Sequence, residues 1–226
     1  RPEDIEIKAA KAAMYQATGD LAEANKYLAD VTALSPSYEA VGAKIAQLRL
    51  EHKSDEAVGL LKRRFAEYQF ESDVEQAVFG YFLTINQYLA GDLSGAQAIG
   101  ARTRDRLVQI NREQPDNDWL AIILSQTYAI LGDRNSAWKE AERVKTITPM
   151  SRDAAVGPSA DENIAVVGTI LGEKSRAIDV LTHLMRIPYS GWLYGGPVTP
   201  ALLRLDPIWD PLRGDPALQK LCQAQR

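Results

Sequence analysis

The chain has 226 residues, of which 46% are hydrophobic and 25% charged, and this composition excludes collagenous and disordered classes because it suffices to bury a core. With 26 Lys and Arg against 30 Asp and Glu, the formal net charge is −4, so nothing in the overall charge calls for a nucleic acid or an acidic membrane. The single cysteine, Cys222, excludes an internal disulfide and a thiolate metal cluster, and it favours a reducing, cytoplasmic location.

A short pattern recurs along the chain: a glycine, an acidic residue directly after it, and an alanine five positions after the glycine. Four copies begin at Gly19, Gly91, Gly132 and Gly172. A fifth alanine, Ala57, follows the segment that starts at His52 in the same frame, but the glycine is missing there. The alanines are 33 to 41 residues apart, a period typical of helical-hairpin solenoids. The pattern predicts five helical hairpins that account for nearly the whole chain.

Each part of the pattern has a physical role in a hairpin. The glycine takes the left-handed conformation that closes a first helix, the acidic residue caps the second helix, and the alanine lets the two helices approach closely. Proline ends three of the second helices, at Pro36, Pro115 and Pro149. We therefore expect turns near Gly19, Ser54, Gly91, Gly132 and Gly172.

The third repeat is longer than the others. Gly91 and Pro115 are 24 residues apart, whereas Gly19 and Pro36 are 17 apart, so the second helix of this repeat should be about two turns longer. We expect it to span about Ser94 to Arg112 and to protrude. Residues 150–158 precede the fifth hairpin and are predicted to form a loop.

The tail differs in composition from the repeats. Residues 187–226 contain six prolines and four glycines, which excludes a sixth regular hairpin. We expect Leu205, Trp209 and Leu212 to form an apolar cover over the fifth hairpin, because the end of a solenoid needs one. Asp215 should cap a short helix that begins at Pro216. The predicted division is a repeat array over 1–189 and a capping segment over 190–226.

Two of the repeats contain a specific signature. The first has Tyr15, Gly19, Ala24, Leu28 and Pro36, and the fourth has Leu124, Ser125, Tyr128, Gly132, Ala137, Ala141 and Pro149. With these residues the chain resembles the tetratricopeptide repeat (TPR) family, and its segment Leu202–Leu221 resembles the end of TPR regions in bacterial signalling proteins. The resemblance implies an all-α fold, a right-handed α-solenoid of about five hairpins. HEAT-type repeats share the longer period but do not explain the recurring glycine and alanine.

The sequence contains few residues arranged for catalysis. His52 and His183 lie in different repeats, and neither has a Cys or His nearby. The glycine-rich segment Gly191–Gly196 lacks the lysine of a phosphate-binding loop and is predicted to wrap the solenoid end. The carboxylates are scattered. We therefore expect no enzyme activity, no metal and no cofactor.

Two basic clusters have the charge that could bind a nucleic acid. One contains Arg102, Arg104, Arg106 and Arg112, and the other contains Lys62, Arg63 and Arg64. Neither has interleaved aromatic residues, and the net charge is negative, so both are predicted to be solvated helix faces.

In TPR families the first helices line a concave groove that receives a peptide or a helix. The repeat phase places six residues of the third and fourth repeats along it: Tyr81, Ile85, Tyr88, Trp119, Ile122 and Gln126. These residues either pack in the core or bind a partner. The resemblance favours a non-catalytic interaction scaffold or regulatory module for a protein or peptide. The alternative is a small-molecule sensor with a pocket near the tail, around Trp192, Tyr194 and Trp209.

The chain shows no feature of membrane insertion. Its longest apolar stretches, 120–124 and 165–170, are far shorter than the roughly 18 residues of a membrane span. Because the chain begins with Arg1 and not with Met, we expect it to be part of a longer protein.

Overall fold

The computed structural model describes residues 4–223, and these residues form helices and no strand, which confirms the predicted all-α class. The helices are α1 (Ile5–Thr18), α2 (Leu21–Tyr27), α3 (Tyr38–Leu50), α4 (Ser54–Glu67), α5 (Asp73–Leu89), α6 (Leu93–Glu113), α7 (Asp118–Ile130), α8 (Arg134–Ile147), α9 (Ser159–Ile170), α10 (Lys174–Leu184), α11 (Pro200–Leu205), the 3-10 helix η1 (Pro207–Leu212) and α12 (Pro216–Gln223).

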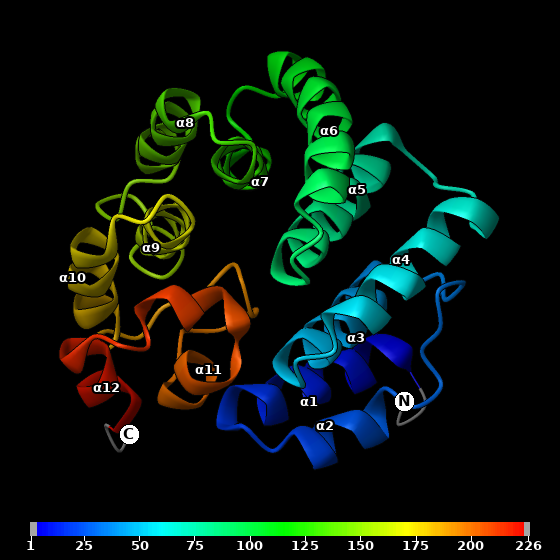
Figure 1. Cartoon of the computed structure of the whole chain (residues 1–226), viewed down its shortest axis with the longest axis horizontal. Coiled ribbons are helices and arrows are strands. Elements are labelled where there is room, and N and C mark those ends of the chain that lie inside the picture. The colour runs from blue at the N-terminus through cyan, green and yellow to red at the C-terminus, as the bar shows by residue number, and fades with distance from the viewer. Residues whose placement is uncertain (1–3, 224–226) are drawn as a thin grey trace.

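The first ten helices are arranged around a ring (Figure 1). Each odd-numbered helix packs against the even-numbered helix that follows it, and contacts between α1 and α3, α5 and α7, and α7 and α9 connect the odd-numbered helices. Figure 1 shows α7 and α9 nearer the centre of the ring than α8 and α10, and the tail that enters the ring contacts α1, α3, α5 and α9. All five predicted turns are confirmed, because a short turn separates the two helices of every pair at the expected position.

Four glycines close the first helices of their pairs in the left-handed conformation, with φ between 78° and 87°. At the first turn the Gly19 N–H donates to the carbonyl of Gln16 at 3.0 Å, and the Asp20 N–H donates to the carbonyl of Tyr15 at 2.9 Å. These two bonds satisfy carbonyls that the end of a helix leaves without partners. The Asp20 carboxylate then accepts the N–H of Glu23 at 3.0 Å and caps α2, as predicted.

The expected acidic cap is wrong at the fifth pair. Glu173 makes no side-chain capping bond to α10. Its carboxylate instead accepts the indole N–H of Trp138 at 3.0 Å and pairs with Arg134, both on α8. The reason is the longer side chain of Glu, which reaches the neighbouring pair, whereas the shorter Asp bonds to its own helix.

The turn between α3 and α4 lacks the glycine, and His52 takes its place with φ 59°. A side chain in the left-handed region costs about 1 to 2 kcal/mol, and glycine avoids this cost but loses about 0.5 to 1 kcal/mol through its greater freedom in the unfolded chain. We therefore expect His52→Gly to raise the free energy of unfolding by about 0.5 to 1 kcal/mol. Urea denaturation measures the change.

The matched control for this prediction is Gly91→His. Gly91 has φ 79°, and a Cβ built there meets no atom within 4 Å. The added side chain would thus strain the backbone of residue 91 without clashing with another atom. We expect this variant to lose about 1 kcal/mol. Equal stability of the wild type and the two variants would contradict the strain at His52.

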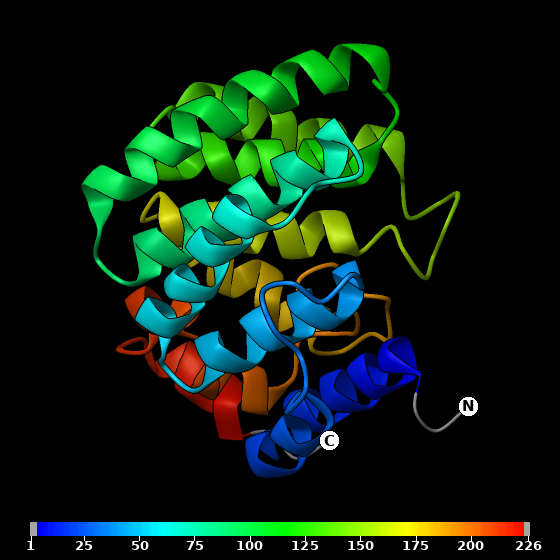
Figure 2. The same cartoon turned by 90° about the vertical axis from the view of Figure 1, so that its right-hand side faces the viewer.

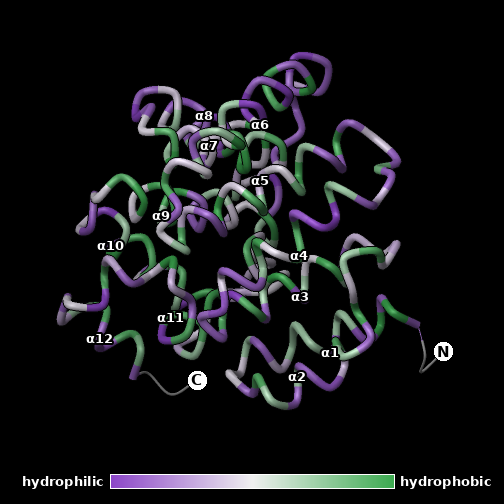
Figure 3. Tube along the Cα trace, turned by 45° about the vertical axis from the view of Figure 1, so that its right-hand side comes forward, coloured by the Kyte–Doolittle hydropathy of each residue, from purple (hydrophilic) through white to green (hydrophobic). Residues whose placement is uncertain are grey.

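The odd-numbered and even-numbered helices differ in burial. In α7 every residue from Leu120 to Thr127 is buried, whereas α8 buries only Ala137, Ala141 and Val144. Figure 3 shows the same contrast, with hydrophobic residues along α5 and α7 and hydrophilic residues at the outer turns. A helix that is apolar on all sides is covered on all sides. Helix α7 is therefore packed on both the outer and the inner side of the ring, whereas α1 at the end of the array buries only Ala9, Ala12 and Gln16.

Two features of the middle of the chain agree with prediction. The helix α6 spans Leu93–Glu113 and is the longest of the described helices at 21 residues, close to the expected Ser94–Arg112. It runs along the outside of the ring (Figure 2). Residues 150–158 form turns before α9, as expected for a loop.

The tail closes the ring. Its 3-10 helix η1 packs on α9 and α10, which confirms the predicted cover over the fifth pair, and α11 also contacts α1. Trp209 and Leu212 are fully buried, while Leu205 is only half-buried. The Asp215 carboxylate accepts the N–H of Ala217 at 2.8 Å, at the start of α12. The contact with α1 was not predicted, and it arises because the ring brings the first and last pairs together (Figure 1).

Candidate functional site

The predicted site residues lie on α5 and α7, at the inner face, which we define as the surface of α1, α3, α5, α7 and α9 that faces the centre of the ring. Four of them, Tyr81, Ile85, Ile122 and Gln126, are at most 2% exposed, and the other two, Tyr88 and Trp119, are partly exposed. In this structure the first four are therefore core residues. Partner binding through Tyr88 or Trp119 stays a prediction.

A buried polar network connects three of the inner helices. The Tyr81 hydroxyl donates to the side-chain carbonyl of Gln126, whose amide donates to Asn163 at 2.9 Å. The Asn163 amide in turn donates to the hydroxyl of Ser125 at 2.9 Å. Every member has a partner, and a satisfied buried network stabilises one arrangement of the helices. Asn163 carries no signal in the sequence, because its partners Ser125 and Gln126 are far away in the chain.

The inner face is occupied by the chain's own tail. The Trp192 ring packs on Tyr81, with 5.8 Å between the ring centroids. Seven residues later, the Thr199 hydroxyl donates to the carbonyl of Ala17 in α1 at 2.6 Å. The segment 187–199 contains no helix, as predicted for its glycine-rich part, and it crosses from one side of the ring to the other.

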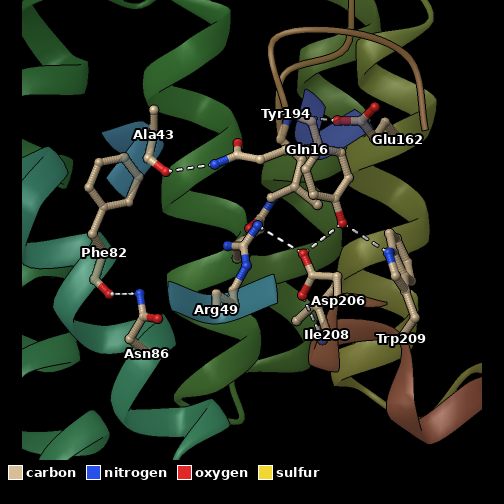
Figure 4. Close-up of polar contacts among 12 residues, drawn as sticks. Gln16, Ala43, Arg49, Phe82, Asn86, Glu162, Tyr194, Asp206, Ile208 and Trp209 are labelled. Atoms are coloured by element: carbon tan, nitrogen blue, oxygen red, sulfur yellow. Dashed lines mark hydrogen bonds and ion pairs between the residues drawn. The ribbon is translucent and has the colours of Figure 1, made fainter. Parts of the chain in front are cut away.

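A buried ion pair fastens the tail to α3 (Figure 4). Arg49 Nη2 lies 2.9 Å from Asp206 Oδ2, and the two side chains are 6% and 0% exposed. Burial acts against the charge of Arg49, but Asp206, Tyr194 and Tyr81 together outweigh it, so the pKa of Arg49 is raised. The Tyr194 hydroxyl donates to Asp206 at 2.7 Å and accepts the Trp209 indole N–H at 3.1 Å.

A second buried carboxylate, Glu162 on α9, holds the glycine-rich segment. It accepts the Tyr189 hydroxyl at 2.7 Å and the backbone N–H of Leu193 at 2.7 Å. Burial raises its pKa to about 7, although these hydrogen bonds lower it in part. A Cβ at Gly191 would lie 2.0 Å from the backbone carbonyl oxygen of Gly196 and 2.6 Å from Glu162 Oε2, so a glycine is needed there for the segment to fold back on itself beside the carboxylate.

Three inner charged groups hold the tail, although Arg49 Nε and the indole N–H of Trp192 are buried without a hydrogen bond to any described residue. Arg49, Asp206 and Glu162 each have partners within the chain, and the rings proposed for a sensor pocket pack in the tail, where Trp209 is fully buried. Between residues 4 and 223 no three His, Cys, Asp or Glu side chains are placed to hold a metal ion. These contacts fasten the tail to four of the helix pairs, through α1, α3, α5 and α9.

An open groove lies on the outside of the ring, between α4 and α6, with α5 as its floor. We call it the outer groove, and its volume is about 570 Å³. It is lined by Lys62, Phe65, Gln76, Ala77, Gly80, Leu83, Gln87, Gly95, Ala98, Ile99, Arg102, Thr103 and Arg106. Its floor is mostly apolar and it has three cationic side chains, but no acidic residue lines it.

Among the described residues, two of the three cations of the outer groove lack an ion pair, and the third, Arg106, pairs with Asp73. Asp73, Asp105 and Glu113 share an adjoining hollow with Arg102 and Arg106. Lys62 and Arg102 are exposed, and neither forms an ion pair with another residue of the described part of the chain. Arg106 Nη1 is buried and makes no hydrogen bond, and the nearest carboxylate oxygen in an ion pair, that of Asp73, is 3.5 Å away. These cations come from the two basic clusters that the sequence predicts to be solvated faces, and the fold brings them to one groove.

The prediction of a solvated face is wrong for Arg64, which is 0% exposed. Its guanidinium donates to the carbonyls of Ala33 and Ser35 at 2.8 and 2.9 Å, pairs with Glu75 at 3.1 Å, and lies over the Tyr68 ring. Arginine can be buried in this way because its planar fork reaches several acceptors at once.

No protein-family model matches the chain, and no curated protein or solved structure matches it either. The likeness to tetratricopeptide repeats thus depends on the signature residues themselves. In the described residues, no helix is both long enough and apolar enough to cross a bilayer.

Proposed function

We propose that the chain is a non-catalytic interaction module, a TPR-like right-handed solenoid of five hairpins, and that it binds a partner protein in the outer groove. The paired helices with glycine turns support the solenoid. The likeness of segment Leu202–Leu221 to TPR ends supports a place in a larger signalling protein of bacterial type. The single cysteine supports a cytoplasmic location.

The observation that supports the outer groove is the contrast between the two faces. At the inner face a partner would have to displace the tail, separating Arg49 from Asp206 and leaving Glu162 without its donors. Breaking one buried ion pair alone costs several kcal/mol. The outer groove has exposed residues such as Ala98 and Arg102 and partly exposed apolar ones such as Phe65 and Ile99, and a partner can cover these without any rearrangement.

Site-specific photo-crosslinking in the native cells tests this proposal. A photoreactive amino acid is placed at Ala98 in the outer groove, at Lys139 on the exposed side of α8, and at Trp119 on α7. We expect a discrete protein adduct from Ala98 and none from Lys139, since only the groove offers a concave apolar surface. Melting curves of the three variants control for folding. An adduct from Trp119 alone would move the site to the inner face and contradict the proposal.

A further inference from the structure

We propose that the occupant of the outer groove is an amphipathic α-helix of the partner, with an apolar stripe flanked by Asp and Glu. This inference rests on the proposed function and adds the conformation and the charge of the bound segment. The apolar lining, the helical walls and the cations of the groove each support one part of it.

The conformation follows from what the groove can offer to a peptide backbone. Its floor and walls are α5, α4 and α6, whose backbone groups are bonded within their own helices, and the described residues contain no strand edge. An extended segment would lose the water around its backbone N–H and C=O groups and find few partners there. A helix satisfies these groups internally, so it can bury one face at little cost.

The shape of the groove also fits a helix. Its lining on α5 runs from Gln76 to Gln87, which is about 16 Å or three turns along the helix axis. Ala98 on α6 is small and exposed, so it leaves room for a large side chain of an incoming helix. Phe65 and Ile99 are partly exposed and supply apolar contact area beside it.

The charge of the occupant follows from the rim. Lys62 stands on the α4 side, and Arg102 and Arg106 are spaced one turn apart on the α6 side. A helix with carboxylates on both sides of its apolar stripe would place them near these cations, one side at α4 and the other at α6. Burial of the apolar stripe next to the cations raises the strength of each ion pair, because the local dielectric falls. A basic helix would meet repulsion along both walls.

Selection from a display library tests the inference. The library holds helix-forming peptides of about 18 residues, or five turns, with all surface positions randomised, and it is selected on the immobilised full chain. We expect the selected peptides to have an apolar stripe flanked by Asp and Glu and to bind more weakly as salt rises. Their affinity should fall at least about tenfold on the double variant Lys62→Gln with Arg102→Gln, since two ion pairs are lost.

The matched control is the double variant Arg63→Gln with Arg112→Gln. These two residues are exposed on α4 and α6 but do not line the groove, so the peptides should bind it as they bind the wild type. Selected peptides without acidic residues, or with unchanged affinity for Lys62→Gln with Arg102→Gln, would overturn the inference, as would an empty selection. Binding of anionic phospholipid vesicles that depends on Lys62 and Arg102, without any selected peptide, would overturn it in favour of a lipid surface.

The two proposals fail in different ways. A protein adduct from Ala98 combined with peptides that lack acidic residues would retain the interaction module and reject the acidic helix. Absence of any adduct from Ala98 together with an empty selection would reject both proposals.

Discussion

Asp206→Ala is expected to lower the free energy of unfolding by about 3 to 5 kcal/mol, because it leaves the buried guanidinium of Arg49 without its counter-charge. The Asp206 side chain is fully buried and its Oδ2 lies 2.9 Å from Arg49 Nη2. It also accepts the N–H of Ile208 at 3.0 Å and the Tyr194 hydroxyl at 2.7 Å. Asp206 thus contacts three groups that the substitution deprives of this partner. Urea denaturation followed by circular dichroism measures the loss of stability.

Two further variants show whether the ion pair itself is responsible. Asp210 lies in the short helix η1, which Asp206 caps, and pairs with Arg213 at 2.8 Å, but both side chains are substantially exposed, so Asp210→Ala should cost less than about 1 kcal/mol. Arg49→Met combined with Asp206→Ala removes both charges, and its loss should be smaller than the sum of the two single losses by about 1 to 3 kcal/mol. Equal losses for Asp206→Ala and Asp210→Ala would contradict the role of the pair. If Asp206→Ala does not fold, Asp206→Asn serves in the same comparison.

The second large effect concerns the pH dependence caused by Glu162. Its pKa in the folded chain is about 7, above the ordinary value of 4.5, because the carboxyl is buried. The folded state therefore holds this proton more tightly than the unfolded state does. Stability from this group is present below pH 4.5 and is lost as pH rises to 7, by about 3 kcal/mol in total. This direction is opposite to that of an ordinary ion-paired carboxylate.

Comparison with Glu162→Gln isolates this effect from other titrating groups. The amide resembles the protonated carboxyl and does not titrate, so it adds a constant offset for its altered bonds to Tyr189 and Leu193. We expect the variant to gain about 3 kcal/mol relative to the wild type between pH 4.5 and pH 8, measured by urea denaturation at each pH. Glu56→Gln, at an exposed position on α4, should show no such gain. A pH-independent difference between Glu162→Gln and the wild type would contradict the raised pKa.

The sequence by itself determined where the turns within the helix pairs lie. A glycine such as Gly91, the aspartate after it and the alanine five positions from it act within a few residues of each other, so their effect does not depend on the rest of the fold. The turn positions, the long α6 and the cap at Asp215 followed from such local signals. The likeness of the repeats to TPR hairpins came from the same residues.

Only the tertiary structure decided what the inner face contains. The partners Arg49 and Asp206, or Glu162 and Leu193, are far apart in the chain, and no periodic pattern indicates that they meet. Residues placed by repeat phase on a concave groove, Tyr81 among them, turned out to be buried under the chain's own tail. The physical reason is the curvature of the ring, which brings α11 against α1.

The composition of the outer groove also depends on contacts between segments that are distant in the chain. Lys62 and Arg102 are ordinary exposed cations in sequence, and only the packing of α4 and α6 across α5 places them on opposite walls of one apolar groove. Arg64, a close neighbour of Lys62, points the other way and is buried. Local signals determine the helix and its turns, because they act through the backbone of one segment. The partner of each side chain depends on contacts between distant segments, which form only when the ring closes.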